Sequence, residues 1–193
     1  MAKHGDTLDT PIPSLFDGDH LRLSDLGESP LIESGPRSGK GSTGSEQSRR
    51  ARPNVHFSSA TDDWGTPQPL FDELSAIFGG FTLDPCATPQ NAKSQTFFTR
   101  EQDGLARRWG GKVFMNPPYG RDISRWVKKA YEESLRGALV VCLLPARTDT
   151  RWWQDYAKHG YVYFLSGRLR FGAALNSAPF PSAIVTFGKF FNR

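Results

Sequence analysis

The chain has 193 residues, a formal net charge of +4 and a pI of 9.2, enough length for one domain of ordinary size and additional unstructured residues. No apolar run reaches the length of a membrane span, and the start of the chain lacks a signal-peptide pattern. Cys86 and Cys142 lie far apart and show no metal-ligand spacing. We therefore expect a soluble cytoplasmic protein with reduced thiols, no metal and no membrane partner.

Residues 1–53 are predicted to form a disordered low-complexity tail. Gly, Ser, Pro and Asp dominate this segment, and its apolar residues follow neither helical nor strand spacing. It holds 7 Lys and Arg against 8 Asp and Glu, which leaves 17 against 12 in residues 54–193. A basic folded part suits a polyanionic partner, although many soluble domains are equally basic. Residues 35–42 resemble a phosphate loop, but the glycine spacing is one residue short and Gly41 takes the place of the hydroxyl residue after Lys40. A nucleoside triphosphatase is therefore disfavoured.

Helical and strand patterns alternate from residue 54 onward. Thr66 and Pro67 form a helix start, with a hydroxyl N-cap followed by Pro at the first helical position, and Gly79 ends the helical spacing. This alternation predicts an α/β fold with a Rossmann-like, doubly wound and mostly parallel sheet. Strands are expected at 81–83, 95–98, 113–115, 138–144, 161–165 and 182–187, and further helices at 123–135 and 150–159.

The sequence Asn116-Pro117-Pro118-Tyr119 directly follows one of these strands. An Asn side-chain oxygen and a backbone carbonyl can accept the two N–H hydrogens of a planar exocyclic amine. The prolines remove backbone donors and fix φ, and the Tyr ring offers a flat face for a base. Asp84 also follows a strand, and ligands of such sheets bind beyond the carboxyl ends of the strands. We predict a pocket for an aminated heterocycle; an ordinary proline-rich loop is the alternative.

Several segments together resemble the small phage-type Dam DNA N6-adenine methyltransferases, from about Asp63 to Phe187. The resemblance implies a class I methyltransferase domain over residues 54–193, S-adenosylmethionine as methyl donor, and adenine in double-stranded DNA as acceptor. The segments are DWGTP (63–67), LDPCAT (83–88), NAK (91–93), DGL (103–105), NPPYG (116–120), LLPARTDTRWW (143–153), GRLRF (167–171) and APFPS (178–182).

The resemblance gives the turn at 116–119 a catalytic role. The amine of a flipped-out adenine would donate to the Asn116 oxygen and the Pro117 carbonyl, while Tyr119 provides a stacking platform. Phe171 is the candidate for the opposite side of a base sandwich, with a core position as the alternative. DNA phosphates could contact Arg147, Arg151, Arg168 and Arg170 or, on the helix after the turn, Arg121, Arg125, Lys128 and Lys129, for which a solvated helix face is the alternative.

The cofactor assignments also follow the resemblance. Asp84 would bind the ribose hydroxyls or the methionine ammonium, although Pro85, Cys86 and Ala87 stand where many methyltransferases have a glycine-rich turn. Asp103 resembles the acidic residue that accepts the cofactor adenine amine, and a helix cap is its alternative. Three further residues would lie near the methionine end, where a capped helix start with a packed aromatic is the alternative: Trp64, Thr66 and Pro67. Cys86 fits a small packing residue better than a nucleophile.

Other acceptors use the same chemistry. Cytosine N4, guanine N2 in RNA and a protein glutamine amide are planar amines that the turn at 116–119 could also hold. A non-catalytic DNA-binding accessory protein is a further alternative, against which an intact Asn116 and Tyr119 argue. The sequence leaves open the recognised DNA sequence and the oligomeric state, with which a monomer is compatible.

Overall fold

The computed structural model describes residues 64–172 and 176–189. The predicted tail at 1–53 and the domain boundary at residue 54 lie outside these residues. The elements in chain order are α1 (Gln68–Phe78), β1 (Lys112–Met115), α2 (Ile123–Leu135), β2 (Leu139–Pro145), α3 (Arg151–Asp155), the 3-10 helix η3 (Ala157–His159), β3 (Tyr161–Phe164) and β4 (Ser182–Phe187).

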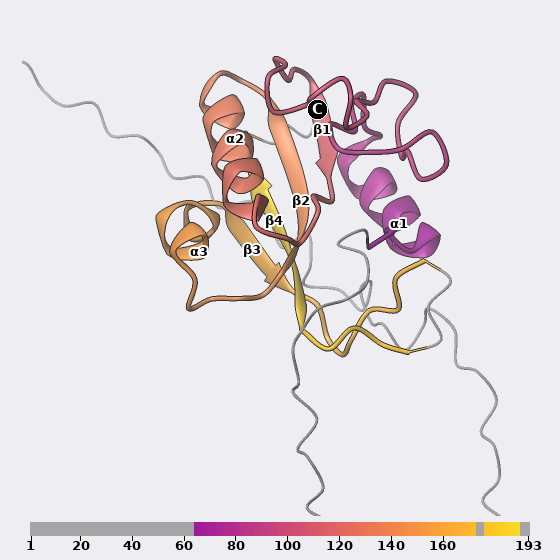
Figure 1. Ribbon diagram of the computed structural model, residues 1–193, viewed down its shortest axis with the longest axis vertical. Helices are drawn as coiled ribbons and strands as arrows, with labels where there is room; N and C mark the ends of the chain where they lie inside the picture. The colour runs from indigo at the N-terminus through magenta and orange to yellow at the C-terminus, as the bar shows by residue number, and fades with distance from the viewer. Residues whose placement is uncertain (1–63, 173–175, 190–193) are drawn as a thin grey trace, which may run out of the picture.

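The four named strands form one mixed sheet in the order β1-β2-β4-β3 (Figure 1). β1 pairs with β2 in parallel, whereas β4 is antiparallel to both β2 and β3. The prediction of mostly parallel pairing is therefore wrong for these strands. Only β4 runs in the opposite direction to the other three, but it lies between β2 and β3 and so makes two of the three pairings antiparallel. The described part of the connection from β3 to β4 contains no helix. A loop without a helix can return a strand antiparallel, while a parallel return usually contains a crossover helix.

Two predicted strands are reduced to single bridges. Leu83 pairs with Val113, and Asp84 pairs with Phe97, both in the parallel sense. The strands predicted at 81–83 and 95–98 are thus present only as these contacts beside β1. They place Asp84 at the same edge of the sheet as the residues that follow β1.

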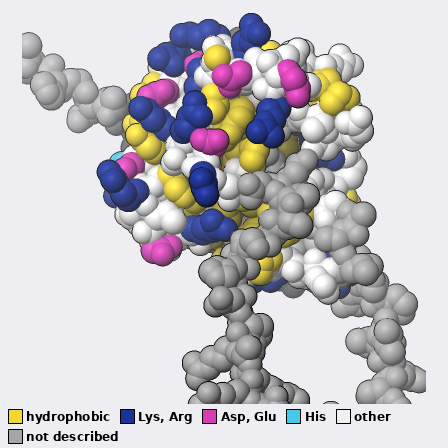
Figure 2. Space-filling model, in the orientation of Figure 1, with side chains coloured by type: hydrophobic (Ala, Val, Ile, Leu, Met, Phe, Trp, Pro, Cys, Tyr) yellow, Lys and Arg dark blue, Asp and Glu magenta, His cyan; other side chains and the backbone are white. Residues whose placement is uncertain are grey.

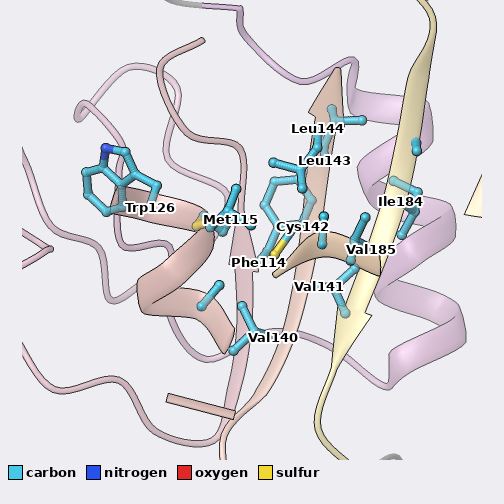
Figure 3. Close-up of a cluster of buried hydrophobic side chains, with 14 of the residues drawn as sticks. Phe114, Met115, Trp126, Val140, Val141, Cys142, Leu143, Leu144, Ile184 and Val185 are labelled. Atoms are coloured by element: carbon cyan, nitrogen blue, oxygen red, sulfur yellow. The ribbon is translucent and has the colours of Figure 1, made fainter. Parts of the chain in front are cut away.

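Helices cover both sides of the sheet (Figure 1). Phe71 of α1 contacts Phe114 of β1 at a ring-centroid distance of 5.2 Å, while α2 packs on β2 and on α3. Every residue of β2 is buried, as its continuous apolar run predicts. Met115, Cys142 and Val185 pair across three strands in the centre of the core (Figure 3).

The start of α1 differs from the sequence prediction by one residue. Pro67 is the N-cap, and its carbonyl accepts the first helical hydrogen bond from the Phe71 amide. The Thr66 hydroxyl caps nothing and instead accepts a hydrogen bond from the Asn116 side chain. At the other end, Gly79 adopts φ +67°, a left-handed conformation that favours glycine.

Within residues 64–172 and 176–189, no helix has the length and apolarity to cross a bilayer. The same residues contain no group of three or more His, Cys, Asp or Glu side chains that could hold a metal ion. Cys86 and Cys142 are not joined in a disulfide, and Cys142 is fully buried.

Candidate active site

Two adjoining hollows lie next to the residues that follow β1. The larger is a cavity of about 610 Å³, within the size range of small-molecule sites. The smaller is a narrow cleft between the segment before α1 and the ends of the strands, and it is lined by Asp84 and Asn116 among others. Cys86 and Asn91 line both, so the two hollows adjoin at these residues.

The Asn116 side chain is fixed in one orientation. Its amide nitrogen donates to the backbone carbonyl of Trp64 and to Oγ1 of Thr66, the latter at 2.9 Å. A carbonyl can only accept, so the amide NH2 must face Trp64 and Oδ1 must point the other way. Oδ1 is buried and has no hydrogen-bond partner among the described residues. A buried acceptor without a donor costs free energy. Oδ1 is therefore suited to accept a hydrogen bond from a ligand.

Asp84 provides a carboxylate in the same cleft. It is only 5% exposed, and it accepts hydrogen bonds from the backbone amides of Cys86 at 3.4 Å and Lys93 at 3.1 Å. Burial raises the pKa of Asp84 to about 6, against the lowering effect of those two amides and of the Lys93 charge. Asp84 is therefore ionised near neutral pH and gains from a cation or hydroxyl donor in the cleft.

The wall of the large cavity is formed by a loop held against α2. Asp103, at its rim, adopts φ +49°, and its Oδ1 accepts a hydrogen bond from the Leu105 amide at 3.2 Å. Asp103 thus caps a turn rather than the helix that the alternative expected, and it also borders the cavity. The indole nitrogen of Trp109 donates to the Gly104 carbonyl at 2.8 Å, and its ring stacks on Trp126 of α2.

Tyr119 is buried rather than presented to the cleft. It is 5% exposed, and its hydroxyl donates to the Leu143 carbonyl at 3.2 Å. Burial raises the pKa of this hydroxyl well above its usual value, so it remains a donor. The Tyr119 ring meets Phe171 at 6.0 Å and 89°. Rings in edge-to-face contact leave no gap for a base, so the expected sandwich is absent from this structure.

Four aromatic rings form one cluster beside the turn at 116–119: Trp64, Tyr119, Phe171 and Phe180. Trp64 contacts Phe171 at 5.2 Å and Phe180 at 5.3 Å, and Tyr119 contacts both phenylalanines. Phe171 is 3% exposed, as its alternative core role predicts. A base could stack here only after one of these rings moves.

The arginines expected at DNA phosphates have different surroundings. The Arg147 guanidinium lies 5.8 Å from the Phe180 ring centroid, which places it against the aromatic cluster. Arg168 and Arg170 are exposed on the loop leading to Phe171. Figure 2 shows Lys and Arg side chains over one face, with acidic side chains between them.

Three of the four cations named at α2 form ion pairs close by. Arg125 pairs with Asp122, Lys128 with Glu132, and Lys129 with the buried Glu133. The exposed pairs of Arg125 and Lys128 fit the alternative of a solvated helix face, whereas the Lys129 side chain is only 15% exposed and its partner is buried. Arg121 lines the large cavity instead.

Seven of the ten residues predicted for catalysis and cofactor binding line the two hollows. Pro118 and Asp103 line the large cavity, Cys86 lines both hollows, and four residues line the cleft: Trp64, Thr66, Asp84 and Asn116. Pro67 and Pro117 line neither of the two hollows, and Pro117 is buried within the turn.

Sequence reasoning gave no role to Asn91 or Lys93, which also line the cleft. Both lie in one of the segments that carry the family resemblance, which was the available signal. The Lys93 ammonium donates to Gln68 Oε1 at 2.6 Å and lies 5.7 Å from the Phe71 ring centroid, so α1 holds it beside Asp84.

The structure is that of an α/β protein with polar groups and a cavity at the strand ends of a sheet covered by helices, where small ligands bind in such folds. Residues 55–184 match the family described as DNA N-6-adenine-methyltransferase (Dam). The chain therefore belongs to the Dam family.

Individual relatives agree with this assignment. The chain is 33% identical over 129 residues to a DNA N-6-adenine-methyltransferase of Escherichia phage T1, covering 57% of this chain and 53% of the relative. It is 32% identical over 114 residues to a DNA N-6-adenine-methyltransferase of Haemophilus phage HP1, covering 57% and 66%. A putative methyltransferase of Escherichia coli K12, YfdM, is 34% identical over 77 residues, covering 36% and 85%. The chain thus spans between half and two thirds of the two phage relatives.

Proposed function

We propose that this protein transfers a methyl group from S-adenosylmethionine to N6 of a flipped-out adenine in double-stranded DNA. The family assignment supports the reaction class, and the two phage relatives are named for adenine methylation. The observation that carries the proposal is the buried Asn116 Oδ1, an acceptor without a donor at the end of β1. An exocyclic amine is the group that this acceptor lacks.

The role of the turn is to make a poor nucleophile usable. The lone pair of the adenine amine is delocalised into the ring, so the amine is planar. Hydrogen bonds from N6 to Asn116 Oδ1 and to the Pro117 carbonyl favour a pyramidal nitrogen and stabilise the positive charge that develops on it. Because Trp64 and Thr66 already fix the amide, little reorganisation is needed when the base arrives.

The residues present fit the proposed cofactor. The large cavity has a volume suited to a molecule of this size, and it shares Cys86 and Asn91 with the cleft that holds Asn116. Asp84 would hold the ribose hydroxyls or the ammonium of the methionine part, and Asp103 would accept the amine of the adenine. When bound, S-adenosylmethionine supplies a methyl group activated by its sulfonium sulfur.

A duplex adenine cannot reach the cleft, so the base must leave the helix. Unstacking costs on the order of a few kcal/mol, which stacking on an aromatic platform partly offsets. We assign Tyr119 and Phe171 to this platform, on condition that their edge-to-face contact opens. Arg147, Arg168 and Arg170 would bind phosphates around the opening and make affinity dependent on salt.

The finer description of the fold belongs to the same proposal. Parallel contacts run from Phe97 through Asp84, β1 and β2, with helices on both sides, which supports a Rossmann-like, doubly wound class I methyltransferase with one reversed strand. We place its domain at residues 54–193 and its site of action in the cytoplasm of a bacterium or a phage-infected cell, where DNA is accessible.

The test is to identify the methylated product. Protein, plasmid DNA and tritiated S-adenosylmethionine are incubated together, and the DNA is digested to nucleosides and separated. We expect the label in N6-methyl-2′-deoxyadenosine. Label in N4-methylcytosine would overturn the acceptor assignment, and label in no polymer, with RNA and protein tested in parallel, would favour the accessory protein.

A further inference from the structure

The buried Asn116 oxygen depends on how its own amide is held. The two hydrogens of the Asn116 NH2 group have two acceptors, the Trp64 carbonyl and Thr66 Oγ1. An amide has nearly the same shape when it is rotated by 180°, so only its hydrogen bonds decide which end faces the cleft. The rotated amide would present NH2 to the incoming amine, and two donors would then oppose each other.

The segment that supplies both acceptors is itself fixed. Pro67 is the N-cap of α1, and its carbonyl accepts from the Phe71 amide at 3.1 Å. The Gly65 carbonyl accepts from the Gly172 amide at 2.8 Å. Thr66 lies between these anchors and is 7% exposed. The backbone hydrogen bonds on both sides and the burial of Thr66 therefore fix the position of its hydroxyl.

We infer that Thr66 is a positioning residue, whose hydroxyl holds the Asn116 amide with Oδ1 toward the substrate amine. The inference rests on the proposed function and deepens it. The Trp64 carbonyl sets which end of the amide faces inward, and Thr66 satisfies the second N–H, which would otherwise be buried without an acceptor in the correct rotamer. The Thr66 hydroxyl touches neither the reacting nitrogen nor the methyl group in this role.

The matched variants are Thr66→Val, which keeps the shape and loses the acceptor, and Thr66→Ser, which keeps the hydroxyl. Under single-turnover conditions with saturating cofactor and DNA, we expect Thr66→Val to slow methyl transfer about five- to tenfold, since one neutral hydrogen bond is lost. Thr66→Ser should stay within about twofold of the unaltered chain, and cofactor affinity measured by calorimetry should stay within about twofold for both. Thr186→Val, a buried threonine of β4, controls for burying a methyl group in place of a hydroxyl.

A second measurement is independent of catalysis. The side-chain amide signal of Asn116 in a ¹⁵N-labelled sample is assigned by its absence in Asn116→Ala. We expect its hydrogens to exchange with water at least about fivefold faster in Thr66→Val than in Thr66→Ser. If Thr66→Val does not fold, Thr66→Ala carries the same expectation without added apolar bulk.

The outcomes separate this inference from the proposed function. If the unaltered protein methylates no DNA, the proposed function fails, and the amide exchange still decides the role of Thr66. Unchanged transfer in Thr66→Val overturns the inference, as does unchanged amide exchange. Equal losses of transfer rate in the Val and Ser variants would mean that Thr66 acts through packing. A weaker cofactor affinity with an unchanged rate at saturation would make Thr66 a cofactor contact. Either result overturns the inference.

Discussion

Asn116→Ala removes the acceptor on which the proposed chemistry depends. The substitution deletes Oδ1 and leaves the Trp64 carbonyl and the Thr66 hydroxyl without the donor they now share. The lost side-chain hydrogen bonds should lower the free energy of unfolding by about 1–2 kcal/mol. In a domain of this size that corresponds to a fall of a few degrees in melting temperature, so the variant should remain folded.

The effect on catalysis should be larger than the effect on stability. Oδ1 is buried, and a hydrogen bond to developing charge in a buried site is stronger than one in water. Removing one such preorganised group typically costs about 10²–10³-fold in rate, or roughly 3–4 kcal/mol of barrier. We expect a loss of at least this size in single-turnover methyl transfer to plasmid DNA, followed with tritiated donor.

Cofactor affinity separates this explanation from general damage. Asn116 lines the cleft but not the large cavity, so calorimetry should give a dissociation constant within about threefold of the unaltered chain, less than the effect of one typical hydrogen bond. Gln154→Ala is the matched control, because it removes an exposed side-chain amide that donates to the Thr148 carbonyl. A rate equal to that of the unaltered protein would remove Asn116 from the mechanism, and a proportional loss of cofactor affinity would assign it to donor binding.

Three further substitutions test other parts of the site. Burial raises the pKa of Asp84 from 3.8 to about 6, so the native state holds this proton more tightly than the unfolded chain does. The free energy of unfolding should therefore fall by roughly 3 kcal/mol as the pH rises from about 4 to about 6. Asp84→Asn should remove this pH dependence in denaturant titrations. Cofactor affinity should weaken as pH drops below about 6 in the unaltered protein, and a flat profile would exclude the Asp84 carboxylate from cofactor binding. Gly104→Ala would place a methyl group 1.9 Å from the Pro85 carbonyl oxygen, so it should cost about 1–3 kcal/mol of stability and weaken cofactor binding; Gly110→Ala, with no atom within 4 Å, is its control, and equal behaviour of the two in thermal unfolding and calorimetry would contradict the described cavity wall. Tyr119→Phe should cost about 1 kcal/mol in thermal unfolding, because its hydroxyl bonds a buried carbonyl, and should keep methyl transfer within a few fold; a rate loss as large as that of Asn116→Ala would give the hydroxyl a part in the reaction.

The elements were predictable where local patterns decide them. The apolar run at 138–144 became β2, and the helical spacing from Ile123 to Leu135 became α2. β4 covers the predicted residues 182–187. Strand direction was not predictable in the same way, because β4 is buried on both faces like β2 although it runs antiparallel, so it lacks the alternation that usually marks an antiparallel strand. The described part of the connection from β3 to β4 has no helix, and a connection without a helix favours an antiparallel return.

Two side chains show where local rules were overridden by distant partners. A Thr before Pro is a favourable helix start, yet the Thr66 hydroxyl bonds Asn116, which is 50 residues away. Tyr119 follows a proline turn at the strand end, yet its ring joins Phe171 and Phe180 from the far end of the chain. Neither contact can be read from residue spacing, because each depends on how the folded sheet brings separate segments together.

The position of Asn116 relative to a substrate amine tests the account most directly. The measurement is a structure of the protein with S-adenosylhomocysteine and a short DNA duplex that contains a methylatable adenine. We predict an extruded adenine whose N6 lies about 2.7–3.2 Å from Asn116 Oδ1, on the side that faces the cofactor sulfur. An Asn116 oxygen that is bonded to protein in that complex, or that faces away from the sulfur, would contradict the account.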